Sequence, residues 1–311
     1  MQHTSKFHAR NVRRAAVSMM ILSSLLVTGR ATGQEAAPTD SDDGAGWFPD
    51  TFVTQPIAAA RSGVDVGAGP LLVRRDPPAG RGDYRSEADA SFGYRLPVYR
   101  FRSAGPNSPG VDVGIEAGVL SRFALGLGDE KNGLINSDFR IAFPIGFDVG
   151  RWEGSLAPTH VSSHIGDDFI VENSGIRPGA SSRNGVELAV MYSLEPGLRL
   201  FGRGDYNWTA VAMETVGARF GLALDPPPTP ERRWRPTGVV EFQVSDINSG
   251  PGVTGTLGMA MRTGTGDVRL GLTGHVGPSE MGQFRRFDEE YVGLYLTFVP
   301  DVVLRSSLPE D

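Results

Sequence analysis

The chain has 311 residues, a formal net charge of −6 and no cysteine. The lack of cysteine excludes structural disulfides, Cys-ligated zinc and thiol catalysis. Residues 1–33 hold five of the thirty Lys and Arg and none of the thirty-six acidic residues, so the rest of the chain has 25 basic against 36 acidic residues. So acidic a chain is not expected to bind nucleic acid, whose phosphates are bound by clustered Lys and Arg.

The N-terminal residues have the pattern of an export signal. A basic stretch precedes an apolar run over 15–28, and Ala31 and Gly33 stand at positions −3 and −1 from a cleavage site before Gln34. The apolar run is too short for a membrane-spanning helix, which needs about 20 residues. We therefore predict that residues 1–33 are a signal peptide.

The next residues, 34–46, are small, polar and acidic, which is typical of a disordered linker. Beyond Trp47 apolar residues alternate with small or polar ones, in segments that Gly, Pro, Asn and Asp separate. A period of two over about ten residues predicts β-strands. The expected strands lie near 63–73, 86–102, 111–124, 137–150, 152–170, 184–195, 197–209, 215–225, 237–247, 252–263, 267–276 and 290–300.

The two faces of these strands differ in chemistry. In the last segment Val292, Leu294 and Leu296 share one face, whereas Tyr295 and Thr297 share the other. A polar face suits a lumen behind a lipid-facing band, and the segments have the roughly 9–11 residues of a membrane-spanning strand. We predict an all-β fold, an antiparallel up-and-down transmembrane barrel of about twelve strands. It would occupy residues 47–311 in the bacterial outer membrane and end in a short periplasmic tail.

The connections between the segments are alternately short and long, as in barrels whose two termini are periplasmic. The tight connections are at 150–151, 195–197 and 264–266, and the longer ones are near 74–85, 125–136, 171–183 and 277–289. The long, proline-rich connection 225–237 is an exception. Trp152 and Trp208 fall at opposite ends of their segments, where aromatic girdles are expected.

The stretch THVSSHIGDDF contains candidate catalytic residues. On a strand His160, Ser162 and His164 project from one face, and a histidine two positions from a serine can accept the hydroxyl proton and activate the serine. Candidates for the group that orients the imidazole are Asp168, Glu172 and Asn184. We select Glu172 for this role. The alternative is a polar stripe that forms hydrogen bonds within the lumen.

The same stretch contains candidate metal ligands. His164, Asp167 and Asp168 could hold a divalent metal. The loop 126–133 is a second candidate for calcium, although it lacks the spaced acidic ligands of a calcium loop and suits a plain external turn. No cofactor is expected, apart from calcium as a candidate. The expected partner is membrane lipid, and envelope lipids are the candidate substrates.

Two family resemblances enter here. The His160-x-Ser162 pair is similar to that of the outer-membrane phospholipase A and lipid A deacylase barrels. Those families place His and Ser at the outer-leaflet end of a strand, with an acidic or amide residue about a dozen positions later, where this chain has Ser174. The opening WFPDTFVTQPIAAARSGVDV and the H-x-S-S-H-x-G-D-D stretch resemble an uncharacterised bacterial envelope family, a domain of unknown function. That resemblance implies an envelope location and gives no activity.

Two functions follow as hypotheses. One is a non-enzymatic barrel with a structural or narrow-pore role. The other is an integral-membrane esterase or lipase that uses His160 and Ser162, which requires both side chains to face lipid. The pattern is ambiguous on this point, because Leu156 shares their parity but Val161 and Ile165 do not.

Overall fold

The computed structural model describes residues 45–49, 65–76, 79–80, 82–101, 110–126, 132–173, 179, 181–229, 232–248 and 250–300. The predicted signal peptide, residues 34–44 of the predicted linker and the tail 301–311 lie outside this part of the chain. Gly46, which the linker prediction includes, already pairs with Arg100.

Almost all of the described chain is β-strand. The strands are β1 (Gly46–Trp47), β2 (Val66–Arg75), β3 (Tyr84–Phe101), β4 (Gly110–Ala124), β5 (Gly133–Ala142), β6 (Ile145–Val149), β7 (Trp152–Ile165), β8 (Ser181–Glu195), β9 (Leu198–Val211), β10 (Val216–Leu224), β11 (Trp234–Ser245), β12 (Gly252–Arg262), β13 (Gly266–Pro278) and β14 (Asp288–Pro300). The helices are α2 (Asp167–Glu172) and the 3₁₀ turn η1 (Gly282–Phe284). Among the described residues, no helix is long and apolar enough to cross a membrane.

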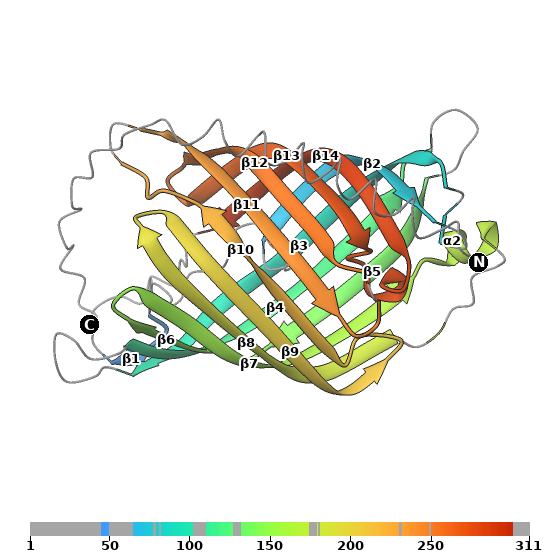
Figure 1. Cartoon of the computed structure of the whole chain (residues 1–311). Coiled ribbons are helices and arrows are strands. Elements are labelled where there is room, and N and C mark those ends of the chain that lie inside the picture. Colours follow the sequence, from blue (N-terminus) through green and yellow to red (C-terminus); the bar gives the residue numbers. More distant parts are fainter. Residues whose placement is uncertain are drawn as a thin grey trace, which may run out of the picture. The chain divides into compact units, whose positions relative to one another are not determined.

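The strands form one closed antiparallel barrel (Figure 1). Consecutive strands from β2 to β14 pair with each other, except that β5 and β6 each pair with β4 and β7, and β14 pairs with β2 to close the ring. Because β5 and β6 share one place between β4 and β7, the wall has twelve strand positions. The predicted barrel of about twelve strands is confirmed.

Two predicted segments differ in detail from the observed strands. The segment 137–150 is interrupted at Pro144, which has no N–H to donate to a sheet. The wall stays hydrogen-bonded there because the Phe143 amide donates to Pro158 and the Gly114 amide donates to Pro144. The segment 152–170 ends as a strand at Ile165, and α2 follows.

The two ends of the barrel differ. One end, which we call the inner end, holds the two termini of the barrel, Val66 and Pro300. It also holds short connections such as 150–151, where Gly150 has a φ of +62°. The connections that contain α2 and η1 lie at the opposite end, which we call the outer end, whereas the long connection 225–233 lies at the inner end. The predicted alternation of short and long connections is therefore observed, apart from 225–233, which the sequence also marks as an exception, and the short outer connection 212–215.

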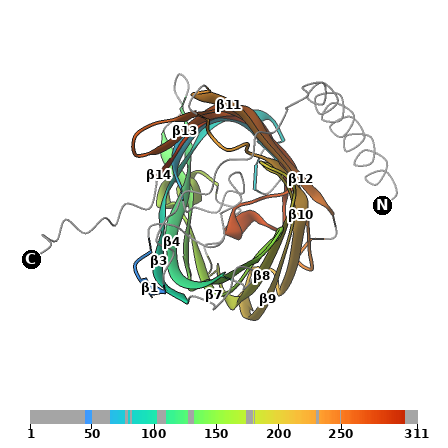
Figure 2. The same cartoon turned by 90° about the vertical axis from the view of Figure 1, so that its left-hand side faces the viewer.

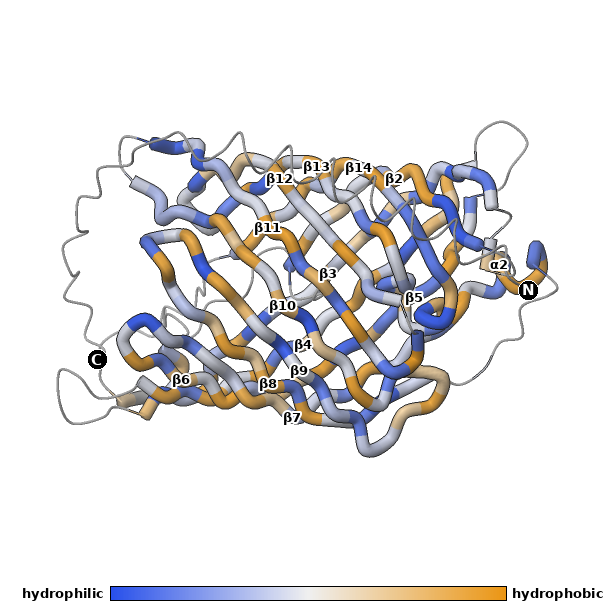
Figure 3. The backbone as a smooth tube through the Cα atoms, in the orientation of Figure 1, coloured by the Kyte–Doolittle hydropathy of each residue, from blue (hydrophilic) through white to orange (hydrophobic). Residues whose placement is uncertain are grey.

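Apolar side chains cover the outside of the wall, and polar side chains fill the inside. On β14 Val292, Leu294 and Leu296 are exposed, whereas Glu289 and Tyr291 are buried. Hydrophobic and hydrophilic stretches accordingly alternate along the strands (Figure 3). This is the reverse of a soluble barrel and the arrangement of a barrel that has lipid for its solvent.

Exposed aromatic side chains mark both ends of the wall. Trp47, Trp152 and Trp234 lie at the inner end, and Tyr84 and Trp208 lie near the outer end. Such rings prefer the interface between water and hydrocarbon. The two groups therefore bracket the apolar band, as expected for Trp152 and Trp208 from their places in the sequence.

A buried cluster of charges joins the closing strands at the outer end of the lumen. Arg122 on β4 donates to Asp89 at 2.5 Å and to Glu289 at 2.8 Å. Arg75 on β2 donates to Glu289 and, through both terminal nitrogens, to Glu87 at 2.6 and 2.5 Å. The five side chains are all less than one-tenth exposed, so each charge depends on its partners for solvation.

The connection between β13 and β14 folds into the lumen at the outer end (Figure 2). Its Gly282 amide donates to Asp138 at 3.0 Å, and its Gln283 amide donates to Ser163 at 3.2 Å. A Cβ on Gly282 would lie 2.8 Å from the Ser163 Cβ, so only glycine allows this approach. Phe284 is buried against Ile135 and other apolar side chains. We call residues 279–287 the plug.

An acidic residue outside the strands also binds the plug. Glu214, in the β9–β10 connection, accepts hydrogen bonds or ion pairs from Arg183 and from Arg285 at 3.0 Å. Burial acts to raise the pKa of Glu214, but these two guanidinium groups outweigh it and lower the pKa to about 2.

We expect Glu214→Gln to weaken the acid sensitivity of the barrel. An ordinary Glu has a pKa of about 4.3, so Glu214 stabilises the fold fully above about pH 5 and loses this contribution as the pH falls toward 2. The urea midpoint of the parent should therefore fall more steeply between pH 5 and 2 than that of Glu214→Gln. The exposed Glu172→Gln is the control, and parallel curves for parent and Glu214→Gln would contradict the assignment.

Candidate functional site

The His160–Ser162 pair lies on the outer face of β7. His160 and His164 are exposed and Ser162 is half-buried, whereas Val161 and Ser163, which point inward, are buried. The three polar side chains thus share the face of the lipid-facing Trp152 and Leu156. This resolves the ambiguity of the sequence pattern, and a lumenal stripe is excluded.

The imidazole of His160 is held by a neighbour on β8. Asn184 lies directly opposite His160 in the sheet, and the His160 Nδ1 is 2.8 Å from the Asn184 Oδ1. Because an amide oxygen can only accept a hydrogen bond, Nδ1 carries the proton. The other ring nitrogen, Nε2, is then unprotonated in neutral histidine and free to accept a proton.

The serine hydroxyl is on the same face two positions along β7. Side chains so placed start about 7 Å apart, a gap that an imidazole ring can bridge to a hydroxyl. Ser162 lies opposite Ser182 on β8 and opposite Phe139 on β5. His160, Ser162 and Asn184 thus lie on one outer face of β7 and β8, and their residue types are those of a base, a nucleophile and an orienting amide.

Apolar side chains surround this polar group. Ile141 and Phe139 on β5 are exposed beside His160 and Ser162, and the Phe139 ring packs edge-on against His164 at 5.8 Å between ring centroids. Polar groups on a lipid-facing wall are costly to solvate and are typically functional. The group is therefore a candidate active site rather than an ordinary part of the wall.

The height of Ser162 can be estimated from the inner aromatic residue of the same strand. Ten positions separate Trp152 from Ser162. At about 3.4 Å per residue and a strand tilt of about 40°, they rise about 26 Å along the barrel axis. The apolar band of an outer-membrane barrel is about 25 Å tall. In a band of that height that begins at Trp152, Ser162 stands at the outer edge.

The remaining predicted site residues lie elsewhere. Glu172 ends α2 and is exposed, and the side chain that contacts His160 is that of Asn184. Asp167 and Asp168 occupy the first turn of α2, and His164 lies on the outer face of β7. Within the described ranges, no group of three or more His, Cys, Asp or Glu side chains is close enough to hold a metal ion. Residues 127–131 of the second calcium candidate lie outside those ranges.

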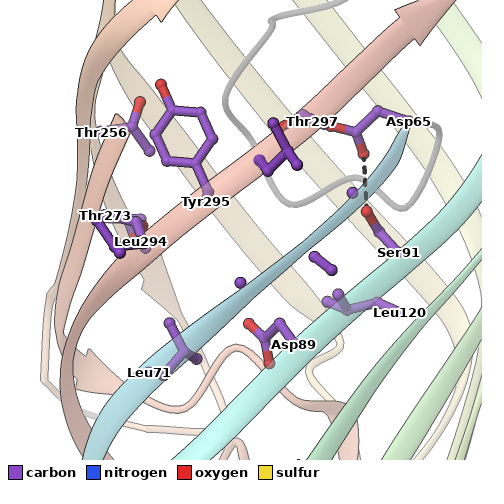
Figure 4. A pocket seen from close by; sticks show the side chains of 15 residues that line it. Asp65, Leu71, Asp89, Ser91, Leu120, Thr256, Thr273, Leu294, Tyr295 and Thr297 are labelled. Atoms are coloured by element: carbon purple, nitrogen blue, oxygen red, sulfur yellow. Dashed lines mark hydrogen bonds between the residues drawn. The ribbon is translucent and has the colours of Figure 1, made fainter. Parts of the chain in front are cut away.

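The lumen behind this wall is not open across its width. A cavity of about 80 Å³ remains beside β2 and β14, lined by Tyr295, Thr297, Ser91 and other hydroxyl groups (Figure 4). Ser91 Oγ lies 3.5 Å from the Asp65 carboxylate at its edge. Ion pairs and the plug occupy the outer half of the lumen.

Comparison with known proteins places the chain in a family. A family model described as a protein of unknown function (DUF1207) matches residues 80–299, which is most of the barrel. The chain belongs to the DUF1207 family. The family resemblance found in the sequence is thereby confirmed, and no curated protein matches the chain.

Solved structures share the fold of this DUF1207 protein. Outer membrane phospholipase A from Escherichia coli aligns over 77% of this chain and 93% of its own, with 13% identity and a TM-score of 0.51. The phospholipase from Salmonella typhi, a dimer with bound calcium, covers 77% and 91%, with 14% identity and a TM-score of 0.51. The KdgM porin covers 75% and 100%, with 9% identity and a TM-score of 0.35. The fold is that of outer-membrane barrels.

Proposed function

We propose that this barrel is an integral outer-membrane esterase, with Ser162 as the nucleophile and His160 as the general base. The observation that carries the proposal is the contact between His160 Nδ1 and Asn184 Oδ1 on the lipid-facing wall beside Ser162. It supplies the third member of a hydrolytic triad, and it leaves Nε2 available to the serine.

The chemistry follows from this arrangement. As Ser162 Oγ attacks an ester carbonyl, its proton passes to His160 Nε2, and a bond forms between Oγ and the acyl carbon. His160 then donates that proton to the departing alkoxide as the ester bond breaks. Water, activated by the same imidazole, hydrolyses the acyl-enzyme and releases the acid. Asn184 stays neutral throughout and holds the ring orientation.

The position of the site supports a lipid ester as the substrate. Ser162 lies at the estimated boundary of the apolar band, the height at which the ester groups of membrane lipids lie between headgroup and acyl chains. The exposed Phe139 and Ile141 give an acyl chain an apolar surface beside the nucleophile. Envelope lipids are therefore the proposed substrate class.

The direct test is the refolded full chain in detergent micelles that contain phospholipid. We expect release of fatty acid, and we expect a fluorophosphonate probe to label the protein at Ser162, as mapped by peptide mass spectrometry. The parent should also show burst kinetics with a chromogenic ester if deacylation is slow. A parent without hydrolysis and without labelling at Ser162 overturns the proposal.

Asn184 is proposed as a positioning residue, and its variants separate it from Glu172. Asn184→Ala should lower kcat by about tenfold or more with little change in KM, because the imidazole loses its orientation. Asn184→Asp keeps an acceptor for Nδ1–H and should retain most of the activity. Glu172→Gln is expected to leave kcat unchanged. A large loss in Glu172→Gln with full activity in Asn184→Ala would restore Glu172 to the role.

The non-enzymatic hypothesis predicts a different set of results. A structural or narrow-pore barrel would give equal background hydrolysis in the parent and all variants. Its pore would be narrow, because paired side chains such as Arg140 and Glu187, 3.2 Å apart, project from the wall into the lumen. Single-channel conductance in planar bilayers measures that property independently of the ester assay.

A further inference from the structure

A cavity rich in arginine lies in the lumen, behind β7, the strand that carries His160 and Ser162. Five arginines and four carboxylates line this space of about 80 Å³, and Val161, between His160 and Ser162 on β7, forms part of its wall. The arginines come from β5, β8, β9, β10 and the plug: Arg140, Arg183, Arg203, Arg219 and Arg285. We call this space the arginine cavity.

Three of these arginines have unused hydrogen-bond donors. The Nε–H groups of Arg140, Arg183 and Arg203 are buried and have no acceptor among the described residues. Their side chains are 15%, 11% and 13% exposed. A buried donor without an acceptor costs about 1–3 kcal/mol, so three around one cavity indicate a missing acceptor.

The carboxylates nearby do not satisfy these donors. Glu187 accepts from an Arg140 terminal nitrogen at 3.2 Å, and it lies 3.9 Å from Arg203 Nε, beyond hydrogen-bond distance. Arg183 uses a terminal nitrogen, not Nε, for Glu214. The protein groups thus leave three buried N–H donors in the cavity without an acceptor.

We propose that the arginine cavity binds a small oxyanion such as inorganic phosphate. Several oxygen atoms on one centre can accept from Nε–H groups on different strands at once, and guanidinium groups favour phosphate and carboxylate geometry. The cavity is several times larger than the roughly 10–15 Å³ that one buried water needs. A bound oxyanion would link β5, β8 and β9 on the lumenal side of the wall without contact with the lipid-facing site.

Titration calorimetry on the full chain, refolded in detergent, tests this with sodium phosphate against sodium chloride of equal ionic strength. We expect saturable phosphate binding with one ion per barrel, and a thermal unfolding midpoint that rises with phosphate as binding to the folded state requires. Arg140→Gln and Arg203→Gln should each bind at least about tenfold more weakly. Arg235→Gln removes a lumenal guanidinium from a separate cluster with Asp225 and Asp267 and should bind phosphate as the parent does.

Titrations with other anions identify which ligand chemistry the cavity recognises. Sulfate in place of phosphate should bind comparably if the cavity recognises a tetrahedral oxyanion, and acetate should bind more weakly. A parent that shows no saturable phosphate binding, and no midpoint shift beyond that of chloride, overturns the proposal without any variant. Equal phosphate affinity in the parent, Arg140→Gln and Arg203→Gln overturns it as well. Ser162→Ala should bind phosphate normally, because the proposal does not rest on the esterase.

Discussion

Replacement of Ser162 by alanine should reduce ester hydrolysis by about 10³-fold or more, to the level of the lipid blank. The hydroxyl is the attacking atom in the proposed reaction, so its loss removes the covalent step and not merely a contact. His160→Ala should cost a similar factor, since it removes the proposed general base. The double variant should be no worse than either single one, because two groups that act in one step lose their effect together.

Ser182→Ala is the matched control for this experiment. It removes a hydroxyl from the same outer face, opposite Ser162 on the neighbouring strand, and should leave hydrolysis within about twofold of the parent. Initial rates on phospholipid micelles, together with heat-modifiable gel mobility to confirm folding, are the measurements. If folded Ser162→Ala retains the parent rate, the serine is not the nucleophile.

The second large effect concerns stability. Arg122→Met should lower the free energy of unfolding by about 3–5 kcal/mol, because Asp89 and Glu289 would stay buried without their guanidinium partner. The change removes charge but keeps much of the side-chain volume, so it tests the charge and not packing. Urea unfolding in liposomes, followed by tryptophan fluorescence, measures the difference.

Two further variants test whether the loss of stability comes from the buried charges. Arg262→Met removes an arginine that is 41% exposed and 3.7 Å from its carboxylate, and exposed pairs of this kind contribute at most about 1 kcal/mol. Adding Asp89→Asn to Arg122→Met should recover part of the lost stability, because it removes one of the stranded charges. An unchanged urea midpoint in Arg122→Met would show that water solvates the cluster.

Much of the fold could be predicted from alternation alone. Each strand of a membrane barrel carries its own period of two, because one face meets lipid and the other meets the lumen. The strand near 290–300 could therefore be predicted from its own residues alone. The break at Pro144 could not be predicted, because apolar and polar residues continue to alternate across it in 137–150. The Phe143 amide, which donates to Pro158, and the Gly114 amide, which donates to Pro144, preserve the wall there.

The site was only half predictable, for a reason of register. His160 and Ser162 lie on one strand, so their common face follows from spacing. Asn184 lies across the 166–180 connection, which is too long to set the register of the next strand. Glu172, which is nearer to His160 in the sequence than Asn184 is, lies at the end of α2 and does not contact His160. The unpaired donors in the arginine cavity could not be predicted from sequence, since they depend on how side chains of β5, β8 and β9 meet in the lumen.

The pairing of β14 with β2 has a consequence for how the barrel assembles. Arg75 and Glu289 are 214 residues apart in the chain, whereas the other strands pair with strands that are adjacent or next but one in the chain. By chain-entropy scaling, that closure costs roughly 3 kcal/mol more than a ten-residue hairpin, and such non-local contacts form late in folding. Shifting β14 by one residue would turn Glu289 outward into lipid. The buried Arg75–Glu289 pair therefore favours the correct register of β14, because the pair can form only when β14 is aligned correctly with β2.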